Sequence, residues 1–307
     1  MTRVAAVDCG TNTIKLLVAD LDPTTGTERE LVREMRMVRL GQDVDRTGRF
    51  ADEALERTFA AVDEYAAIVA DHDAEAIRFC ATSAARDASN GEEFAAGVEA
   101  RLGVRPEVVT GAEEAQLSYD GATRGLVGKD HPAPFLVVDI GGGSTELILG
   151  DGHGHVRAAR SLDIGSVRMT ERHLRSDPPT HDEVAAAASE VASAIAGSGV
   201  PLEQARTVIG VAGTITTVAA GVLDLDGYDR AAIDQAELAF ADVHALTERL
   251  LAMTVDERKA LPYMHPGRAD VIGAGALILD EVLRRSDVDT LLVSEADILD
   301  GIAWSVA

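Results

Sequence analysis

The sequence predicts an α/β protein. Short apolar runs rich in valine, isoleucine and leucine alternate with longer segments whose apolar residues recur at helical spacing, and this alternation favours sheets covered by helices. One strand–turn–strand pattern occurs twice, in Val4–Asp20 (VAAVDCGTNTIKLLVAD) and in Phe135–Gly150 (FLVVDIGGGSTELILG). The 307 residues are too many for one small core and are typical of two domains. We therefore expect two similar α/β halves.

The first half reads as a strand meander followed by alternating helices and strands. Residues 52–71 carry apolar side chains at helical spacing above acidic positions, which predicts an amphipathic helix. The other elements expected in this half are strands over residues 1–40 with a return at 20–26, strands at 76–81 and 106–110, and helices at 91–102 and 111–124.

A connector that contains proline and histidine, Gly128–Pro134, separates the two halves. The domains are therefore expected at residues 1–126 and 127–307. Thr180 and Glu183 fit a capping box ahead of an alanine-rich helix. The other elements expected in this half are strands from 135 to 150 and from 156 to 163, a strand at 205–210, helices at 239–252 and 270–285, a strand at 291–294 and a helix at about 297–307.

The glycine turn at Gly141–Gly143 is the strongest chemical signal. It follows Asp139 at a strand end and precedes Ser144, Thr145 and Glu146. Glycine permits positive φ and a close approach to a ligand, and successive backbone N–H groups in such a turn bind anions. The two hydroxyls add donors, and a carboxylate at the strand end suits a divalent cation. The alternative is an ordinary glycine-rich hairpin.

Repetition of this turn favours the functional interpretation. Asp8 lies 131 positions before Asp139 and is followed by a second loop, Gly10, Thr11, Asn12 and Thr13. A third apolar run, in VIGVAGTITT (208–217), ends in a Gly-x-x-Gly-Thr pattern that contains Gly213 and Thr214. Two copies of one device in similar halves suggest a shared ligand.

Charge and composition limit the classes of partner. The net charge is −24, so binding of nucleic acid through the general surface is not expected, because that binding needs Lys and Arg to neutralise phosphates. A polyanionic substrate would be repelled at long range and would have to be held by local donors and metal ions. No apolar run approaches the ~20 residues that span a bilayer, and no signal peptide is visible, so a soluble cytoplasmic protein is expected. Cys9 and Cys80 are expected as reduced buried thiols.

The motifs resemble one family closely, the exopolyphosphatase and guanosine pentaphosphate phosphatase family of the actin-like ATPase and sugar kinase superfamily. The resemblance follows the family's order and covers nearly the whole chain. It is carried by DCGTNTIKLLVAD, VRLGQDVDRTGRF, CATSAARDASN, VVTGAEEAQLSYDG, DIGGGSTELILG, SLDIGSVRMTE, GVAGTITTVAA and GRADVIGAGALIL. It implies two ribonuclease-H-like domains with an interdomain active-site cleft, and a final helix that packs back on the first domain.

The resemblance also implies the role of one residue, and position and chemistry suggest roles for others. The second glutamate of the Gly-x-Glu-Glu-Ala motif, Glu114, is the expected catalytic base; without the resemblance, Glu113 and Glu114 read only as acidic residues of a helix start. Arg86 can make bidentate contacts with phosphate, and its alternative is a surface arginine paired with Asp87 or Glu93. Asp8, Asp139 and Glu146 are expected to hold Mg²⁺ or Mn²⁺, and the three loops are expected to bind phosphate.

The expected activity is release of terminal orthophosphate from inorganic polyphosphate, with a preference for short chains because this chain resembles the family's short form. Guanosine pentaphosphate 5′-phosphatase activity is the first alternative. A small-molecule kinase and a non-catalytic actin-like scaffold are weaker alternatives, and a homodimer is compatible with the sequence, which does not fix the oligomeric state. One motif departs from the family: its usual Gly-Leu-Arg-Glu-Gly appears here as Asp-Ile-Leu-Asp-Gly (297–301), without the arginine.

Overall fold

The computed structural model describes residues 1–126 and 129–307. Its contacts divide the chain into two compact units. Unit 1 consists of Met1–Gly121 together with Ile298–Ala307, and unit 2 consists of Ala122–Asp297. The predicted boundary between residues 126 and 127 involves positions outside the described residues. The final helix belongs to unit 1, where its buried residues share a hydrophobic cluster with those of the first two strands.

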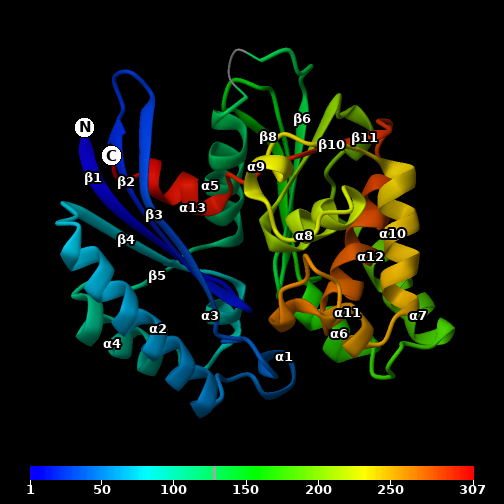
Figure 1. Ribbon diagram of the computed structural model, residues 1–307, viewed down its shortest axis with the longest axis horizontal. Coiled ribbons are helices and arrows are strands. Elements are labelled where there is room, and N and C mark those ends of the chain that lie inside the picture. Colours follow the sequence, from blue (N-terminus) through cyan, green and yellow to red (C-terminus); the bar gives the residue numbers. More distant parts are fainter. Residues whose placement is uncertain (127–128) are drawn as a thin grey trace. The chain divides into compact units, whose positions relative to one another are not determined.

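Unit 1 is an α/β unit built on a five-stranded sheet (Figure 1). Its elements in chain order are β1 (Thr2–Cys9), β2 (Thr13–Asp22), β3 (Thr27–Met37), α1 (Val44–Thr47), α2 (Asp52–Asp71), β4 (Ala76–Ala81), α3 (Ser83–Asp87), α4 (Gly91–Leu102), β5 (Glu107–Val108), α5 (Gly111–Arg124, whose last turn passes into unit 2) and α13 (Ile298–Trp304).

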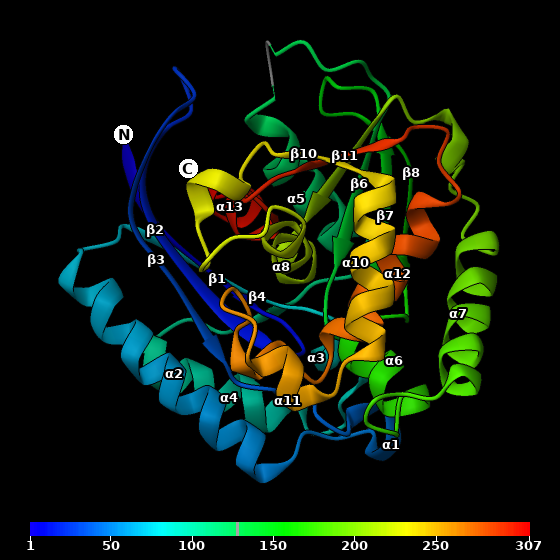
Figure 2. The same ribbon diagram turned by 45° about the vertical axis from the view of Figure 1, so that its right-hand side comes forward.

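Alternation along β1 divides the core of unit 1 into two layers. Ala5 and Val7 face a cluster that includes side chains of α2 and α4, and these two helices run side by side along the sheet (Figure 2). Val4 and Ala6 face a second cluster, to which α13 and α5 contribute. Because successive side chains of a strand point to opposite faces, Asp8 lies on the face that α5 and α13 cover.

Unit 2 is also an α/β unit, built on a six-stranded sheet. Its elements in chain order are β6 (Phe135–Ile140), β7 (Thr145–Gly150), β8 (Val156–Leu162), α6 (Ser166–His173), α7 (His181–Ala196), η1 (Leu202–Gln204), β9 (Thr207–Val211), α8 (Ala212–Val222), α9 (Arg230–Ile233), β10 (Glu237–Ala239), α10 (Phe240–Ala252), α11 (Val255–Lys259), η2 (Pro266–Arg268), α12 (Ile272–Leu283) and β11 (Thr290–Val293).

The two sheets repeat one topology. Unit 1 has the strand order β3-β2-β1-β4-β5, and unit 2 has β8-β7-β6-β9-β11 with β10 added at the edge. In each unit the first three strands form an antiparallel meander, and the strand on the other side of the first runs parallel to it. The repeat predicted from Asp8 and Asp139 is therefore a repeat of the whole sheet, with β1 equivalent to β6 and β4 to β9.

Most predicted elements are confirmed. The amphipathic helix at 52–71 is α2, and the capping box of Thr180 with Glu183 starts α7. The helices α6 and α8, which are the next elements after β8 and β9, were not predicted from the sequence. Their starts are rich in glycine and β-branched residues, so local propensity did not indicate a helix.

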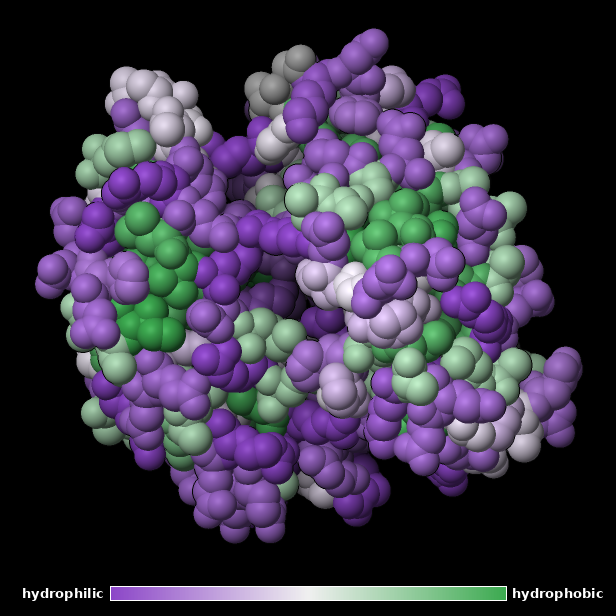
Figure 3. All heavy atoms as spheres, in the orientation of Figure 1, coloured by the Kyte–Doolittle hydropathy of each residue, from purple (hydrophilic) through white to green (hydrophobic). Residues whose placement is uncertain are grey.

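The surface agrees with the composition. The face shown in Figure 3 is mostly hydrophilic, with small separate apolar patches. Within residues 1–126 and 129–307, no helix has the length and apolarity needed to cross a bilayer.

Candidate active site

The predicted functional residues gather at one edge of each sheet. The parallel strands β1, β4 and β5 are followed by Gly10–Thr13, by Thr82–Arg86 and by Thr110–Glu114. In unit 2, β6 and β9 are followed by Gly141–Ser144 and by Ala212–Thr217. Carboxyl ends of parallel strands meet at the same sheet edge, where α/β proteins bind ligands. The third loop predicted from the sequence, which contains Gly213 and Thr214, is thus the counterpart in unit 2 of the Thr82–Arg86 segment of unit 1.

The glycine turn of unit 2 presents a row of uncommitted donors. The Gly141 amide closes the turn by donating to the Ser144 carbonyl over 3.0 Å. The next three N–H groups, those of Gly142, Gly143 and Ser144, donate to no partner in the described part of the chain. Consecutive free N–H groups in a tight turn form an anion-binding nest. The Thr145 hydroxyl donates instead to the Ile164 carbonyl, so the ligand role expected for Thr145 stays a prediction.

Two carboxylates lie beside this turn. Asp139 and Glu146 are directly opposite each other on β6 and β7, which places their Cβ atoms about 5 Å apart on one face of the sheet. Both residues are buried, and the Ser161 hydroxyl donates to Glu146 Oε1 over 2.7 Å. Like charges at such a distance repel, so a divalent cation would stabilise the pair. No group of three or more His, Cys, Asp or Glu residues forms a metal centre within the described ranges.

The equivalent loop of unit 1 carries a different charge pattern. Gly10 closes its turn as Gly141 does, by donating to the Thr13 carbonyl over 2.9 Å. Asp8 is paired across the strands with Lys15, the position equivalent to Glu146, and Lys15 Nζ lies 3.7 Å from Asp8 Oδ2. A lysine thus already offsets the Asp8 charge in this loop, and the metal role expected for Asp8 stays a prediction.

Thr11 is the residue of this loop that points most directly to a ligand. Its side chain is buried, and its Oγ1 has no hydrogen-bond partner among the residues that the structure describes. A buried hydroxyl without a partner is costly, and an anion at the loop would remove that cost.

Arg86 and Glu114 are brought together by the fold of unit 1. Arg86 Nη1 lies 2.6 Å from Glu114 Oε2 and also donates to the Val109 carbonyl over 3.0 Å. The alternative partners considered for Arg86, Asp87 and Glu93, are not the ones it contacts here. The guanidinium retains further N–H groups, because its bonds to Val109 and Glu114 both use Nη1.

The neighbouring glutamate has a separate partner. Glu113 Oε1 lies 2.7 Å from Arg78 Nη2, which also bonds Glu107 over 2.8 Å. Arg78 Nη1 in turn donates to the Ser305 hydroxyl at the C-terminus. Glu113 is 44% exposed and Glu114 only 8%. The structure therefore separates the two glutamates by burial and by partner, although their sequence context does not.

The third loop begins a helix and contacts an arginine. Gly213 and Thr214 lie in the first turn of α8, and a Cβ on Gly213 would come within 2.1 Å of Arg268 Nη2. Arg268 Nη1 donates to the Thr217 hydroxyl over 3.1 Å, and burial lowers the pKa of its guanidinium. A side chain at this position would therefore displace the guanidinium of Arg268. Whether Gly213 and Thr214 bind phosphate stays a prediction.

A polar group near this loop was missed from the sequence. The Tyr228 hydroxyl donates to the Glu295 carboxylate and lies 3.0 Å from the Thr216 hydroxyl. The same carboxylate lies 3.6 Å from Arg230 Nε. Tyr228 is 48% exposed as a residue, but desolvation of its hydroxyl group and the charge of the nearby Glu295 carboxylate raise the pKa of the phenol. The residues come from α8, from the start of α9 and its preceding segment, and from the segment after β11, so spacing along the chain gave no signal for them.

Other residues singled out by composition are accounted for locally. Cys9 and Cys80 are buried free thiols, as expected, and burial raises the pKa of both.

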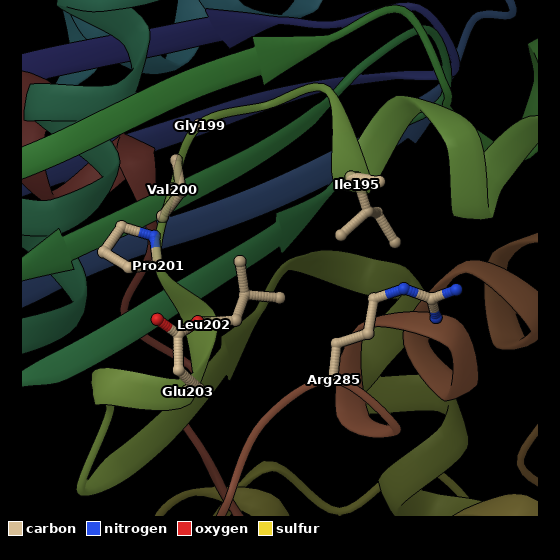
Figure 4. Close-up of a pocket in the computed structure, with 8 residues that line it drawn as sticks. Ile195, Gly199, Val200, Pro201, Leu202, Glu203 and Arg285 are labelled. Carbon is tan, nitrogen blue, oxygen red and sulfur yellow. The ribbon is translucent and has the colours of Figure 1, made fainter.

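A cavity of about 300 Å³ lies elsewhere in unit 2, at the end of α7. Its lining is mostly apolar, with the Arg285 side chain on one side (Figure 4). None of the predicted site residues lines it.

The repeated α/β units, with a row of free backbone N–H groups at the carboxyl edge of unit 2, are typical of the ribonuclease-H-like class. The chain belongs to the Ppx/GppA phosphatase family, whose model matches residues 21–306. It is 50% identical to exopolyphosphatase 2 of Mycobacterium tuberculosis, over 100% of this chain and 99% of the relative.

Solved structures agree with this assignment. An exopolyphosphatase-like protein is similar with a TM-score of 0.95 and 46% identity, over 99% of this chain and 98% of the other. The Aquifex aeolicus member of the Ppx/GppA family is similar with a TM-score of 0.83 and 30% identity, over 99% of this chain and 97% of the other. These findings confirm the predicted family and fold class. The expected active-site cleft between the two domains stays a prediction.

Proposed function

We propose that this protein is an exopolyphosphatase, which hydrolyses the terminal phosphoanhydride bond of inorganic polyphosphate and releases orthophosphate. The observation that carries the proposal is the row of three uncommitted N–H groups at Gly142, Gly143 and Ser144. Such a row suits the oxygens of a phosphoryl group, because each N–H can donate to one of them without prior rearrangement. The full-length identity to a protein named exopolyphosphatase 2 supports polyphosphate as the substrate.

Local donors are the chain's means of binding a polyanion despite its net charge of −24. Neutral backbone amides stabilise negative charge without adding a formal positive charge. Arg86 forms an ion pair with Glu114, so the pair adds no net positive charge, but the N–H groups of Arg86 outside this pair can donate to phosphate oxygens. The uncompensated Thr11 hydroxyl adds a further donor at the same edge.

Glu114 is the proposed general base. It is buried, it lies in the first turn of α5, and Arg86 fixes its carboxylate through a short ion pair. An ionised carboxylate held in this way can accept a proton from an attacking water or orient it. Hydrolysis then needs an in-line water and a stabilised leaving oxygen, which is mainly a matter of positioning.

Asp139 and Glu146 fit a magnesium or manganese ion. Their two carboxylates are cross-strand neighbours beside the glycine turn, and Mg²⁺ in phosphoryl-transfer sites is commonly held by one or two carboxylates with water and substrate oxygens. When bound, such an ion would offset phosphate charge and polarise the reacting phosphoryl group.

Hydrolysis can be distinguished from kinase chemistry directly. The experiment measures orthophosphate release from polyphosphate with Mg²⁺ and no acceptor, beside transfer from ATP to a panel of sugars and small carboxylates. We expect release without an acceptor. Acceptor-dependent ATP consumption without polyphosphate hydrolysis would overturn the proposal in favour of a kinase of the same superfamily.

A further inference from the structure

The carbonyl groups of the glycine turn are all held from one side. The Gly141 carbonyl accepts from the Ser166 amide over 2.9 Å, and the Gly142 carbonyl accepts from the amides of Val167 and Arg168 over 2.9 and 3.1 Å. The Gly143 carbonyl accepts from Arg168 Nε over 2.8 Å. Three successive carbonyls are thus bonded to the first turn of α6.

This arrangement dictates where the turn's N–H groups point. Within one planar trans peptide, the C=O and the N–H point in opposite directions. Because the carbonyls of Gly141, Gly142 and Gly143 point at α6, the N–H groups of Gly142, Gly143 and Ser144 must point away from it. The same contacts that occupy the carbonyls therefore create the row of free donors.

Gly165 allows α6 to approach this closely. A Cβ at Gly165 would lie 2.3 Å from the Gly142 carbonyl oxygen and 2.5 Å from the Gly143 carbonyl carbon. These are backbone atoms, so a side chain at this position would push α6 and the turn apart.

Unit 1 repeats the device with backbone groups alone. The Thr11 carbonyl accepts from the Gly41 amide over 2.8 Å, and the Asn12 carbonyl accepts from the amides of Val38 and Arg39 over 3.1 and 2.9 Å. A Cβ at Gly41 would overlap Thr11, with 2.3 Å to Cγ2. In both units the segment after the third strand holds the carbonyls of the loop. In unit 2, unlike unit 1, one of these carbonyls is bonded by a side chain, that of Arg168.

We propose that Arg168 is a positioning residue for the phosphate-binding turn. Its guanidinium holds the Gly143–Ser144 peptide so that the Ser144 N–H faces the ligand, and its charge acts through the turn rather than by contact with substrate. This role rests on the proposed function, because it assumes that the turn binds a phosphoryl group.

The test compares Arg168→Met with Arg172→Ala on the same helix. Arg172 lies one turn further along α6 and forms an ion pair with Glu190 of α7, at 2.5 Å, so its replacement controls for effects on helix stability. The measurements are thermal melting, KM and kcat with tripolyphosphate, and calorimetric affinity for an imido analogue of tripolyphosphate that resists hydrolysis.

For Arg168→Met we expect KM and the dissociation constant of the analogue to rise roughly tenfold to hundredfold, while kcat changes less. This is the contribution of one hydrogen bond to a charged group, here the bond from the Ser144 N–H to a phosphate oxygen. Arg172→Ala should bind like the wild type. Arg168→Lys, which keeps the charge but not the planar donor, should lie between and serves as the second variant if the methionine protein does not fold.

Unchanged affinity in Arg168→Met, with the wild-type protein binding the analogue, would overturn the positioning role and leave the proposed function intact. Equal losses in Arg168→Met and Arg172→Ala would also overturn it, because they would indicate a general effect on α6. If the wild-type protein neither bound the analogue nor released phosphate, the proposed function and the positioning role would fall together, and the wild-type measurement alone would reveal this.

Discussion

Replacement of Gly301 by alanine is expected to destabilise unit 1 and to displace α5. A Cβ on Gly301 would lie 1.9 Å from the Leu117 carbonyl oxygen and 2.7 Å from the carbonyl carbon. Both are backbone atoms of a helix, so α13 or α5 must shift. Overpacking of this kind costs about 1–3 kcal/mol, and this overlap belongs at the upper end. The better helix propensity of alanine returns ~1 kcal/mol. The net loss is about 2 kcal/mol, or a fall in Tm of roughly 4–8 °C.

The assay is thermal and urea unfolding of Gly301→Ala beside Gly91→Ala. Gly91 is the first residue of α4, and a Cβ there would meet only the Ala85 carbonyl oxygen, at 3.9 Å. The control should therefore melt at or slightly above the wild-type temperature. Turnover of Gly301→Ala should also fall, since Leu117 lies one turn after Glu114 on α5. A Gly301→Ala protein that melts within about 1 °C of the wild type would show that α13 and α5 accommodate the extra methyl group without loss of stability.

Four other outcomes are expected. Glu114→Gln should lower turnover by about 10² or more and keep polyphosphate affinity, whereas Glu113→Gln should be mild; equal behaviour of the two variants would refute the base assignment. Excess chelator should abolish activity, and Asp139→Ala should lose activity far more than thermal stability; full activity in chelator would contradict the metal requirement. Moderate salt should reduce activity little or raise it, because it screens repulsion by the −24 charge, and short chains should be preferred; steep salt inhibition with a preference for long chains would count against this. The pKa of Asp20 is lowered from 3.8 to about 2, first by a hydrogen bond from Arg3. The ionised Asp20 carboxylate stabilises the folded protein fully above the pKa of the unfolded chain, and this stabilisation is lost as pH falls through the lower pKa of the folded protein. In Asp20→Asn, the free energy of unfolding should therefore fall less steeply between about pH 4 and 2 than in the wild type. The same pH dependence in both proteins would contradict this.

The loops and their order were predictable because they depend on local chemistry. Asp8 and Asp139 each end an apolar run and precede small polar residues. Such a pattern involves only neighbouring residues, so it can be recognised without knowledge of the fold. The two-fold repeat of the sheet follows the same signal, since the strands flank the loops.

The partners of these loops were not predictable, because they come from distant segments. Arg168 reaches the glycine turn from α6, a helix whose glycine start gave no helical signal. The pairing of Arg86 with Glu114 joins residues 28 positions apart, and the spacing alone could not exclude Asp87 or Glu93. The lysine beside Asp8 is a consequence of strand register, which places Lys15 opposite it. Such contacts depend on register and tertiary packing, so they appear only when the sheet is assembled.

We propose that this chain hydrolyses inorganic polyphosphate with phosphate held by its backbone loops. The most direct test is initial phosphate release by the wild-type protein from tripolyphosphate, long-chain polyphosphate and guanosine pentaphosphate, side by side at equal concentrations with Mg²⁺. We expect release from polyphosphate, fastest from the short chain, and slower release from guanosine pentaphosphate. Release from guanosine pentaphosphate alone, or from none of the three, would contradict it.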